Sequence, residues 1–138
     1  MEVFIFTLGV VAAVVSYLSK TFVVEPLVHF NAVRGRVHGE LKFYANVPGN
    51  NVKKELQDEA GRALRRLSSE LDAAYRAVGL NKLLISIRLI PSEKSIHEAS
   101  RGLIFLSNNV GPRSQGDDDR LWAVPDEIRR HLGIQSIR

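Results

Sequence analysis

The hydrophobic pattern changes abruptly about two dozen residues into the chain. Residues 3–18 contain no charged side chain, and residues 4–15 are apolar on every side of a helix rather than along one stripe. A helix that is apolar all round needs lipid or a protein core around it. Counted through Phe22, Val23 and Val24, with Lys20 extending its ammonium group toward water, the segment reaches the roughly 20 residues that cross a bilayer. The pattern predicts one transmembrane helix within residues 1–25.

Two other interpretations of this segment stay open. A cleaved signal peptide begins with basic residues and ends at small ones. Here the chain starts with Met1 and Glu2, and residues 16–20 read Ser-Tyr-Leu-Ser-Lys, a poor cleavage site. The second alternative is a buried core helix, because the strictly uncharged run is shorter than a typical span. The membrane span is the interpretation adopted here.

Residues 26–138 show helical stripes separated by turn signals, and they suffice for one domain with a modest core. Apolar spacings of three and four predict helices over residues 27–44, 56–78, 93–108 and 125–132. The narrow apolar seam of the second consists of Leu56, Ala60, Leu64, Leu67, Leu71, Ala74 and Val78. Glu25-Pro26 predicts a bend between the span and this domain, because proline disfavours a helical residue before it. Gly79 and Gly133 are expected to end their helices as C-caps.

The stretch Leu83–Ile90 is ambiguous. Its alternation of Ile85, Ile87 and Leu89 with polar residues has the period of a strand. No second convincing strand is present to satisfy its backbone, so we favour a short helix or extended connector packed on the bundle. A segment this apolar could also lie in the membrane interface or cover a partner. The expected fold class is all-α, with one N-terminal transmembrane helix followed by a small antiparallel helical bundle.

Charge predicts the orientation of the span. All 19 Lys and Arg residues lie at or after Lys20, and Glu2 is the only ionisable side chain before it. Positive charge close to a span marks its cytoplasmic side, so we expect the N-terminus outside and residues 26–138 in the cytoplasm. The absence of cysteine agrees with a reducing compartment. From Lys20 onward the chain has 19 basic and 14 acidic residues, and this basic excess is spread along the sequence, so it does not indicate nucleic-acid binding.

Two groups of residues are candidate contact sites. The small residues of the span would pack on helices of other membrane proteins, with Gly9 and Ala13 at small-xxx-small spacing. This group is Gly9, Ala12, Ala13 and Ser16. Basic residues at and beyond the end of the span would bind anionic lipid headgroups, at about 1 kcal/mol each. This second group is Lys20, Arg34, Arg36 and Lys42. An ordinary solvated helix face is the alternative explanation for it.

The sequence contains no motif for a reaction. There is no Gly-rich phosphate loop, no His-Glu-x-x-His and no cysteine pair. His29 and His38 are nine residues apart, about 180° around a helix, so they cannot share a metal on one helix. The run Asp117–Asp119 lacks the glycine and distal glutamate of a calcium loop. We expect no catalytic residue, metal ligand or cofactor; an enzyme site near His97 or the Asp117 loop is the alternative.

Two local phrases resemble segments of known proteins. They are Leu41–Val47 (LKFYANV) and Glu98–Asn108 (EASRGLIFLSN). They are similar to segments in uncharacterised bacterial single-span membrane proteins with a small helical cytoplasmic domain. The resemblance implies anchoring in the bacterial inner membrane and brings no activity with it. If the phrases matter structurally, Tyr44, Asn46 and Asn108 would be buried polar groups that need hydrogen-bond partners. The favoured interpretation is that Asn46 and Asn108 lie near predicted helix ends, where asparagine is common.

Together these features predict a membrane-anchored, non-enzymatic interaction protein. Its expected role is that of an accessory or structural subunit of a larger membrane protein complex, with membrane lipid and other membrane subunits as partners. The alternative is a peripheral regulator that binds anionic headgroups through its juxtamembrane basic helix.

Overall fold

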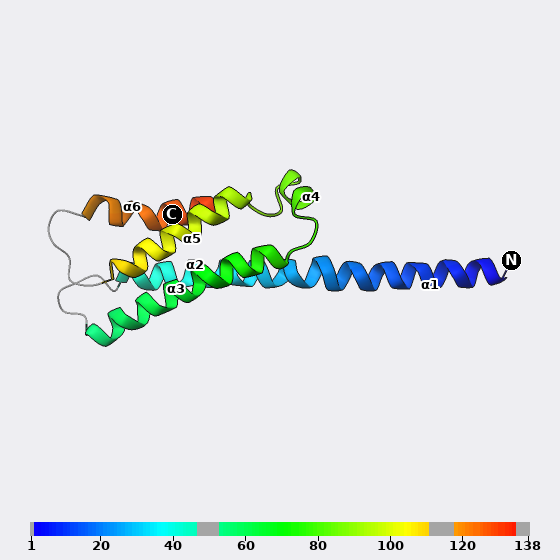
Figure 1. Cartoon of the computed structure of the whole chain (residues 1–138), viewed down its shortest axis with the longest axis horizontal. Helices are drawn as coiled ribbons and strands as arrows, with labels where there is room; N and C mark the ends of the chain where they lie inside the picture. The colour runs from blue at the N-terminus through cyan, green and yellow to red at the C-terminus, as the bar shows by residue number, and fades with distance from the viewer. Residues whose placement is uncertain (1, 47–52, 111–117, 135–138) are drawn as a thin grey trace.

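The computed structural model describes residues 2–46, 53–110 and 118–134, and within these ranges every regular element is a helix. The elements in chain order are α1 (Glu2–Ser19), the π-helical segment η1 (Lys20–Val24), α2 (Glu25–Asn46), α3 (Lys54–Ala77), α4 (Asn81–Ser86), α5 (Glu93–Asn108) and α6 (Asp118–His131). Helices α1, η1 and α2 form one long rod, and the bundle covers only its α2 half (Figure 1). The predicted fold class, an apolar N-terminal helix followed by an antiparallel helical bundle, is confirmed.

The core of the bundle is built from the predicted apolar stripes. Helix α3 packs against both α2 and α5, and α6 packs against α5. The contribution of α2 consists of Phe30, Val33, Val37, Leu41 and Tyr44, all buried. The seam predicted for α3 is buried from Ala60 to Val78, whereas Leu56, in the first turn, is exposed. These stripes form a single continuous hydrophobic cluster, so the bundle has one core.

Pro26 does not separate the span from the bundle. Proline has no N–H to donate to the carbonyl of Phe22, and its ring crowds that carbonyl. The segment η1 widens the turn in front of it, because the N–H of Glu25 donates to the carbonyl of Lys20, five residues back. Such a π-bulge lets a helix continue past an obstacle. The predicted bend at Glu25-Pro26 is therefore wrong, and one helix runs through residues 5–44.

Gly79 has a role different from the predicted one. Helix α3 ends at Ala77 with Val78 as an extended C-cap, and the left-handed residue is Leu80, with φ 56°. A Cβ atom on Gly79 would lie 2.8 Å from the carbonyl oxygen of Phe22, closer than real Cβ atoms approach. This carbonyl is the one that Pro26 leaves without its helical partner. Glycine is thus needed at position 79 for close approach to η1 and not for a left-handed cap.

Helix α6 begins earlier than predicted and ends as predicted. It starts at Asp118, so Pro125 lies inside it rather than at its beginning. The helix continues through this position and loses only the one hydrogen bond that Pro125 cannot donate. At the other end Gly133 has φ 65°, its N–H donates to Arg130 and that of Ile134 donates to Arg129. This pair of bonds is a Schellman motif, which confirms Gly133 as the C-cap.

The ambiguous stretch contains a short helix. Its first residues belong to α4, which follows α3 after a turn, and residues 87–92 connect α4 to α5. Leu84 and Ile90 are buried in the common core. The favoured prediction, a short helix and connector packed on the bundle, is confirmed. The alternation of Ile85, Ile87 and Leu89 does not mark a buried face, because Ile87 and Leu89 are exposed and the buried residues of this stretch are Leu84 and Ile90.

The polar residues of the two resembling phrases have different environments. The ring of Tyr44 is buried, and its hydroxyl has no hydrogen-bond partner among the described residues. Asn108 is exposed, and its Oδ1 accepts a bond of 2.7 Å from Arg65 Nη2. The side chain of Asn46 lies outside the described residues. Asn108 thus ends α5 at the surface, as the favoured interpretation of a helix-end asparagine predicts, and the burial that a structural role of the phrase would require is not found there.

Candidate functional site

The outstanding surface of the molecule is the helix segment Ile5–Val24. Every side chain from Ile5 to Lys20 is exposed, and Phe6 is exposed to 75%. In the described chain this is the one helix long and apolar enough to cross a membrane, and none of its apolar window is buried. Twenty residues at about 1.5 Å each span about 30 Å, the thickness of the hydrocarbon core. A core helix would be covered by the bundle, and this segment is not.

The predicted small residues of the span form one face. Gly9, Ala12, Ala13 and Ser16 fall within about 100° of arc on a helix with 3.6 residues per turn. All four are exposed, and a Cβ on Gly9 would meet nothing within 4 Å. The face is thus open along its length, and a backbone of another helix can approach it closely. Its packing role stays a prediction.

The structure places Arg34 inside the protein's own framework rather than on a free basic face. Its guanidinium is half-buried over the ring of Phe30, 5.8 Å from the ring centroid. Nη1 donates to Asn31 Oδ1 at 2.8 Å, and Nη2 donates to the backbone carbonyl of Leu132. Burial lowers the pKa of Arg34 from its ordinary value. This residue binds the C-terminal end of α6, where the helix dipole favours a cation.

The other three predicted headgroup residues are not gathered around it. Arg36 Nη2 forms an ion pair with Glu70 Oε2 of α3 at 2.7 Å. Lys20 lies in η1 and Lys42 near the far end of α2, and both are exposed. Twenty-two helical residues separate them, about 33 Å along the axis. The structure therefore does not bring Lys20, Arg34, Arg36 and Lys42 into one layer.

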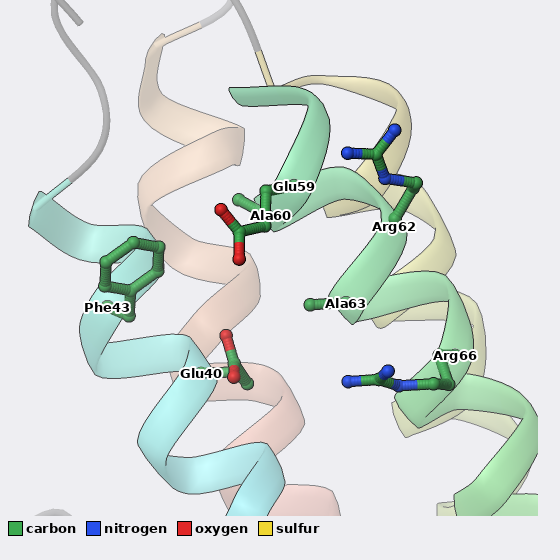
Figure 2. A pocket seen from close by; sticks show the side chains of 7 residues that line it. All are labelled: Glu40, Phe43, Glu59, Ala60, Arg62, Ala63 and Arg66. Carbon is green, nitrogen blue, oxygen red and sulfur yellow. The ribbon is translucent and has the colours of Figure 1, made fainter. Parts of the chain in front are cut away.

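An open groove lies between α2 and α3, on the half of the bundle remote from α1. It has a volume of about 650 Å³ and is lined by Glu40, Phe43, Glu59, Ala60, Arg62, Ala63 and Arg66. Figure 2 shows the carboxylates of Glu40 and Glu59 facing the groove from opposite helices. The lining contains no Ser, Thr, Cys, Lys or His side chain. Two carboxylates and two guanidinium groups thus lie around a small apolar floor.

A second groove lies where α4, α5 and α6 meet α2. Its volume is about 350 Å³, and it is lined by Arg34, Ile85, Arg88, Leu89, Ile90, Pro91, Ser92, Ser95, Arg130, His131, Leu132 and Gly133. Three arginines but no carboxylate belong to this lining. Arg88 and Arg130 form no ion pair with the described residues. Sequence analysis missed both arginines here, because they come from connections and helix ends far apart in the chain.

The histidines do not assemble a site. Among the residues that the structure describes, no three His, Asp or Glu side chains come close enough together to hold a metal. His97 is exposed on α5, and Asp117 lies outside the described residues. At His38, burial, followed by the positive charges of Lys42 and Arg129, lowers the pKa of the imidazole. Its Nδ1 has no partner in the described structure.

Comparison with known proteins gives no match: no family model fits the chain, and no curated protein or solved structure is similar to it. The resemblance of the two phrases to bacterial single-span proteins therefore stays a prediction. The function has to be argued from the geometry of the chain itself.

Proposed function

We propose that this protein is a membrane-anchored, non-enzymatic interaction protein whose N-terminal helix spans the bilayer. The observation that carries the proposal is that no residue of the apolar segment Ile5–Val24 is buried and that all residues from Ile5 to Lys20 are exposed, outside a bundle that already has its own closed core. Full burial of a large apolar side chain is worth about 1.5–3 kcal/mol. Eleven large apolar side chains of this segment are exposed, so water is an unfavourable environment for it. They are Ile5, Phe6, Leu8, Val10, Val11, Val14, Val15, Tyr17, Leu18, Phe22 and Val24.

The domain lies on the cytoplasmic side in this proposal, and the membrane is the inner membrane of a bacterium. Support for the orientation comes from charge: every Lys and Arg lies at or beyond Lys20, the side that stays in the cytoplasm. The bacterial membrane rests on the two resembling phrases, Leu41–Val47 and Glu98–Asn108. Continuity of the helix from Ile5 into α2 fixes the bundle directly to the span, without a flexible linker.

The role that we propose is an accessory or structural subunit of a larger membrane complex. The open face of Gly9 and Ala13 permits close packing of a second transmembrane helix, and the groove between α2 and α3 offers mixed charge to a cytoplasmic partner. This favours a protein partner over the alternative lipid regulator, because Arg34 and Arg36 already bind within the chain. Membrane lipid then surrounds the span.

The test is extraction of the native protein from membranes in a mild detergent, without crosslinker, followed by sizing and mass spectrometry. We expect resistance to alkaline extraction, an intact mass that retains Ile5–Val24, and co-migration with other membrane proteins in fixed ratio. A mature protein that lacks the segment would show a signal peptide and refute the anchor. A protein that retains the segment but runs alone would refute the subunit role.

A matched pair of variants tests the packing face. Gly9→Leu with Ala13→Leu fills that face, whereas Val11→Leu with Val15→Leu enlarges the opposite one. We expect only the double variant Gly9→Leu with Ala13→Leu to lose co-migration with the complex, whereas both double variants should stay in the membrane. Equal co-migration of the two double variants would exclude Gly9 and Ala13 from the contact.

A further inference from the structure

The segment Leu80–Leu89 concentrates exposed apolar side chains at one end of the bundle. Within these ten residues four large apolar side chains are exposed to between 47% and 61%. They are Leu80, Leu83, Ile87 and Leu89. By contrast, the 24 residues of α3 and the 16 of α5 each expose one, namely Leu56 and Ile104. A connection that faced only water would be polar, so this concentration calls for an apolar environment.

The segment is folded rather than frayed. Leu84 and Ile90 are buried in the core, and the N–H groups of Arg88 and Leu89 donate to the carbonyls of Ile85 and Leu84. Leu80 and Arg88 bracket it with φ angles of 56° and 58°. Left-handed residues other than glycine cost of order 1–3 kcal/mol and persist where the surroundings impose them. The outward position of the apolar side chains is thus fixed by the fold.

Its position relative to the span follows from Gly79. The Cα of this residue packs against the carbonyl of Phe22, since a Cβ there would lie 2.8 Å from the oxygen. Phe22 is two residues from Val24, about 3 Å along the helix axis. Accordingly α4 lies at the end of the bundle from which α1 projects (Figure 1). If residues 5–24 cross the bilayer, the segment lies level with the boundary between acyl chains and headgroups.

The charges within the segment and along the neighbouring groove are basic. Lys82 and Arg88 belong to it and are exposed, and the neighbouring groove adds Arg130 but no carboxylate. Each such cation near an anionic leaflet contributes about 1 kcal/mol of attraction. Apolar side chains flanked by basic ones are the composition of segments that lie in the membrane interface.

We propose that Leu80–Leu89 is a second membrane contact, which inserts Leu80, Leu83, Ile87 and Leu89 into the interface of the bilayer that the N-terminal helix crosses. This inference rests on the proposed function and adds to it. A single span can still tilt and rotate in the bilayer, and the bundle that is fixed to it moves with it. Two contacts, the span and this segment, hold the bundle in one orientation and present the α2–α3 groove to the cytoplasm at a fixed height.

The chain contains no cysteine, so single cysteines carry spin labels without background. The labels are placed at Leu83→Cys in the segment, at Ile104→Cys as an equally apolar exposed control on α5, and at Val11→Cys within the span. The full-length protein is reconstituted in vesicles of phosphatidylcholine and phosphatidylglycerol. Accessibility of each label to molecular oxygen and to a water-soluble nickel complex is then measured by power saturation.

We expect the ratio of oxygen to nickel accessibility to be several-fold higher at position 83 than at position 104, and highest at position 11. A label at Ile87→Cys, one turn further on, should agree with position 83. A water-like ratio at 83 with a lipid-like ratio at 11 would overturn the inference and leave the anchor intact. Low access of both reagents at 83 would indicate a protein contact and would also overturn it. A water-like ratio at 11 would refute the span itself.

Discussion

One continuous helix serves two environments in this protein. Its first half, Ile5–Val24, exposes apolar side chains on all sides, whereas its second half, α2, buries a single stripe against α3. Phe6 and Phe30 illustrate the difference, with exposures of 75% and 0%. Apart from the π-helical segment η1, both halves are α-helical, so the side-chain pattern rather than the backbone distinguishes a helix that is apolar on all sides from one with a single core-facing stripe. The junction at η1 and Gly79 is where one environment replaces the other.

The largest expected loss of stability comes from substitution of Phe30, and Phe6 is its control. Phe30→Ala removes a fully buried ring that meets Tyr75 edge-on at 5.9 Å, and we expect a loss of about 3–5 kcal/mol in the free energy of unfolding of the bundle. Phe6→Ala, in the same helix, should leave that free energy unchanged. Chemical unfolding in mild detergent, followed by the fluorescence of Trp122, measures both. Equal losses would mean that the two halves share one environment.

A second comparison concerns the two arginines of α2. Arg34→Met leaves the C-terminal carbonyl of α6 without a charged donor, for which we expect a loss of about 1.5–3 kcal/mol. Arg36→Met breaks only its half-exposed ion pair with Glu70, which is worth at most about 1 kcal/mol. The same unfolding measurement ranks the two. A larger loss at Arg36 would contradict the structural role of Arg34.

Substitution of two glycines by alanine tests the contact between Gly79 and η1. Gly79→Ala forces a Cβ into the carbonyl of Phe22, so we expect a loss of about 1–3 kcal/mol. Gly35→Ala, in the interior of α2, meets nothing within 4 Å and should stabilise by about 0.5–1 kcal/mol. A decrease in the free energy of unfolding for Gly79→Ala and an increase for Gly35→Ala would confirm the close approach of Gly79 to η1. A neutral or stabilising Gly79→Ala would show that the two segments are farther apart.

The smallest expected effect is the pH dependence from His38. Burial and the nearby Lys42 and Arg129 lower its pKa in the folded protein, whereas the unfolded chain has the ordinary value near 6.5. Below pH 6.5 the unfolded state therefore binds a proton that the folded state resists, and stability falls until the pH passes the folded pKa. His38→Gln should reduce this fall, measured as unfolding free energy between pH 7.5 and about 5. The exposed His29→Gln should retain it, and equal slopes for both variants would contradict the prediction.

Much of the fold could be predicted from the sequence, because the signals involved are local. Apolarity on every side of residues 4–15 and spacings of three and four beyond them report the environment around each helix. Caps are equally local: the Oγ of Ser92 accepts from the N–H of Ser95, and Gly133 takes a left-handed conformation. These features determined an apolar anchor and a helical bundle before any contact between helices was known.

Tertiary structure decided the features that depend on contacts between residues far apart in the sequence. Whether Pro26 breaks the helix depends on a π-bulge, and Gly79 is required by a carbonyl 57 positions earlier in the chain. Arg34 has the sequence signature of a basic surface residue, yet the end of α6, 98 positions away, binds it. Periodicity gives the face of a residue but not its partner. The position of Leu80–Leu89 at the end of the bundle from which α1 projects was likewise beyond the sequence, because it depends on the close approach of Gly79 to Phe22.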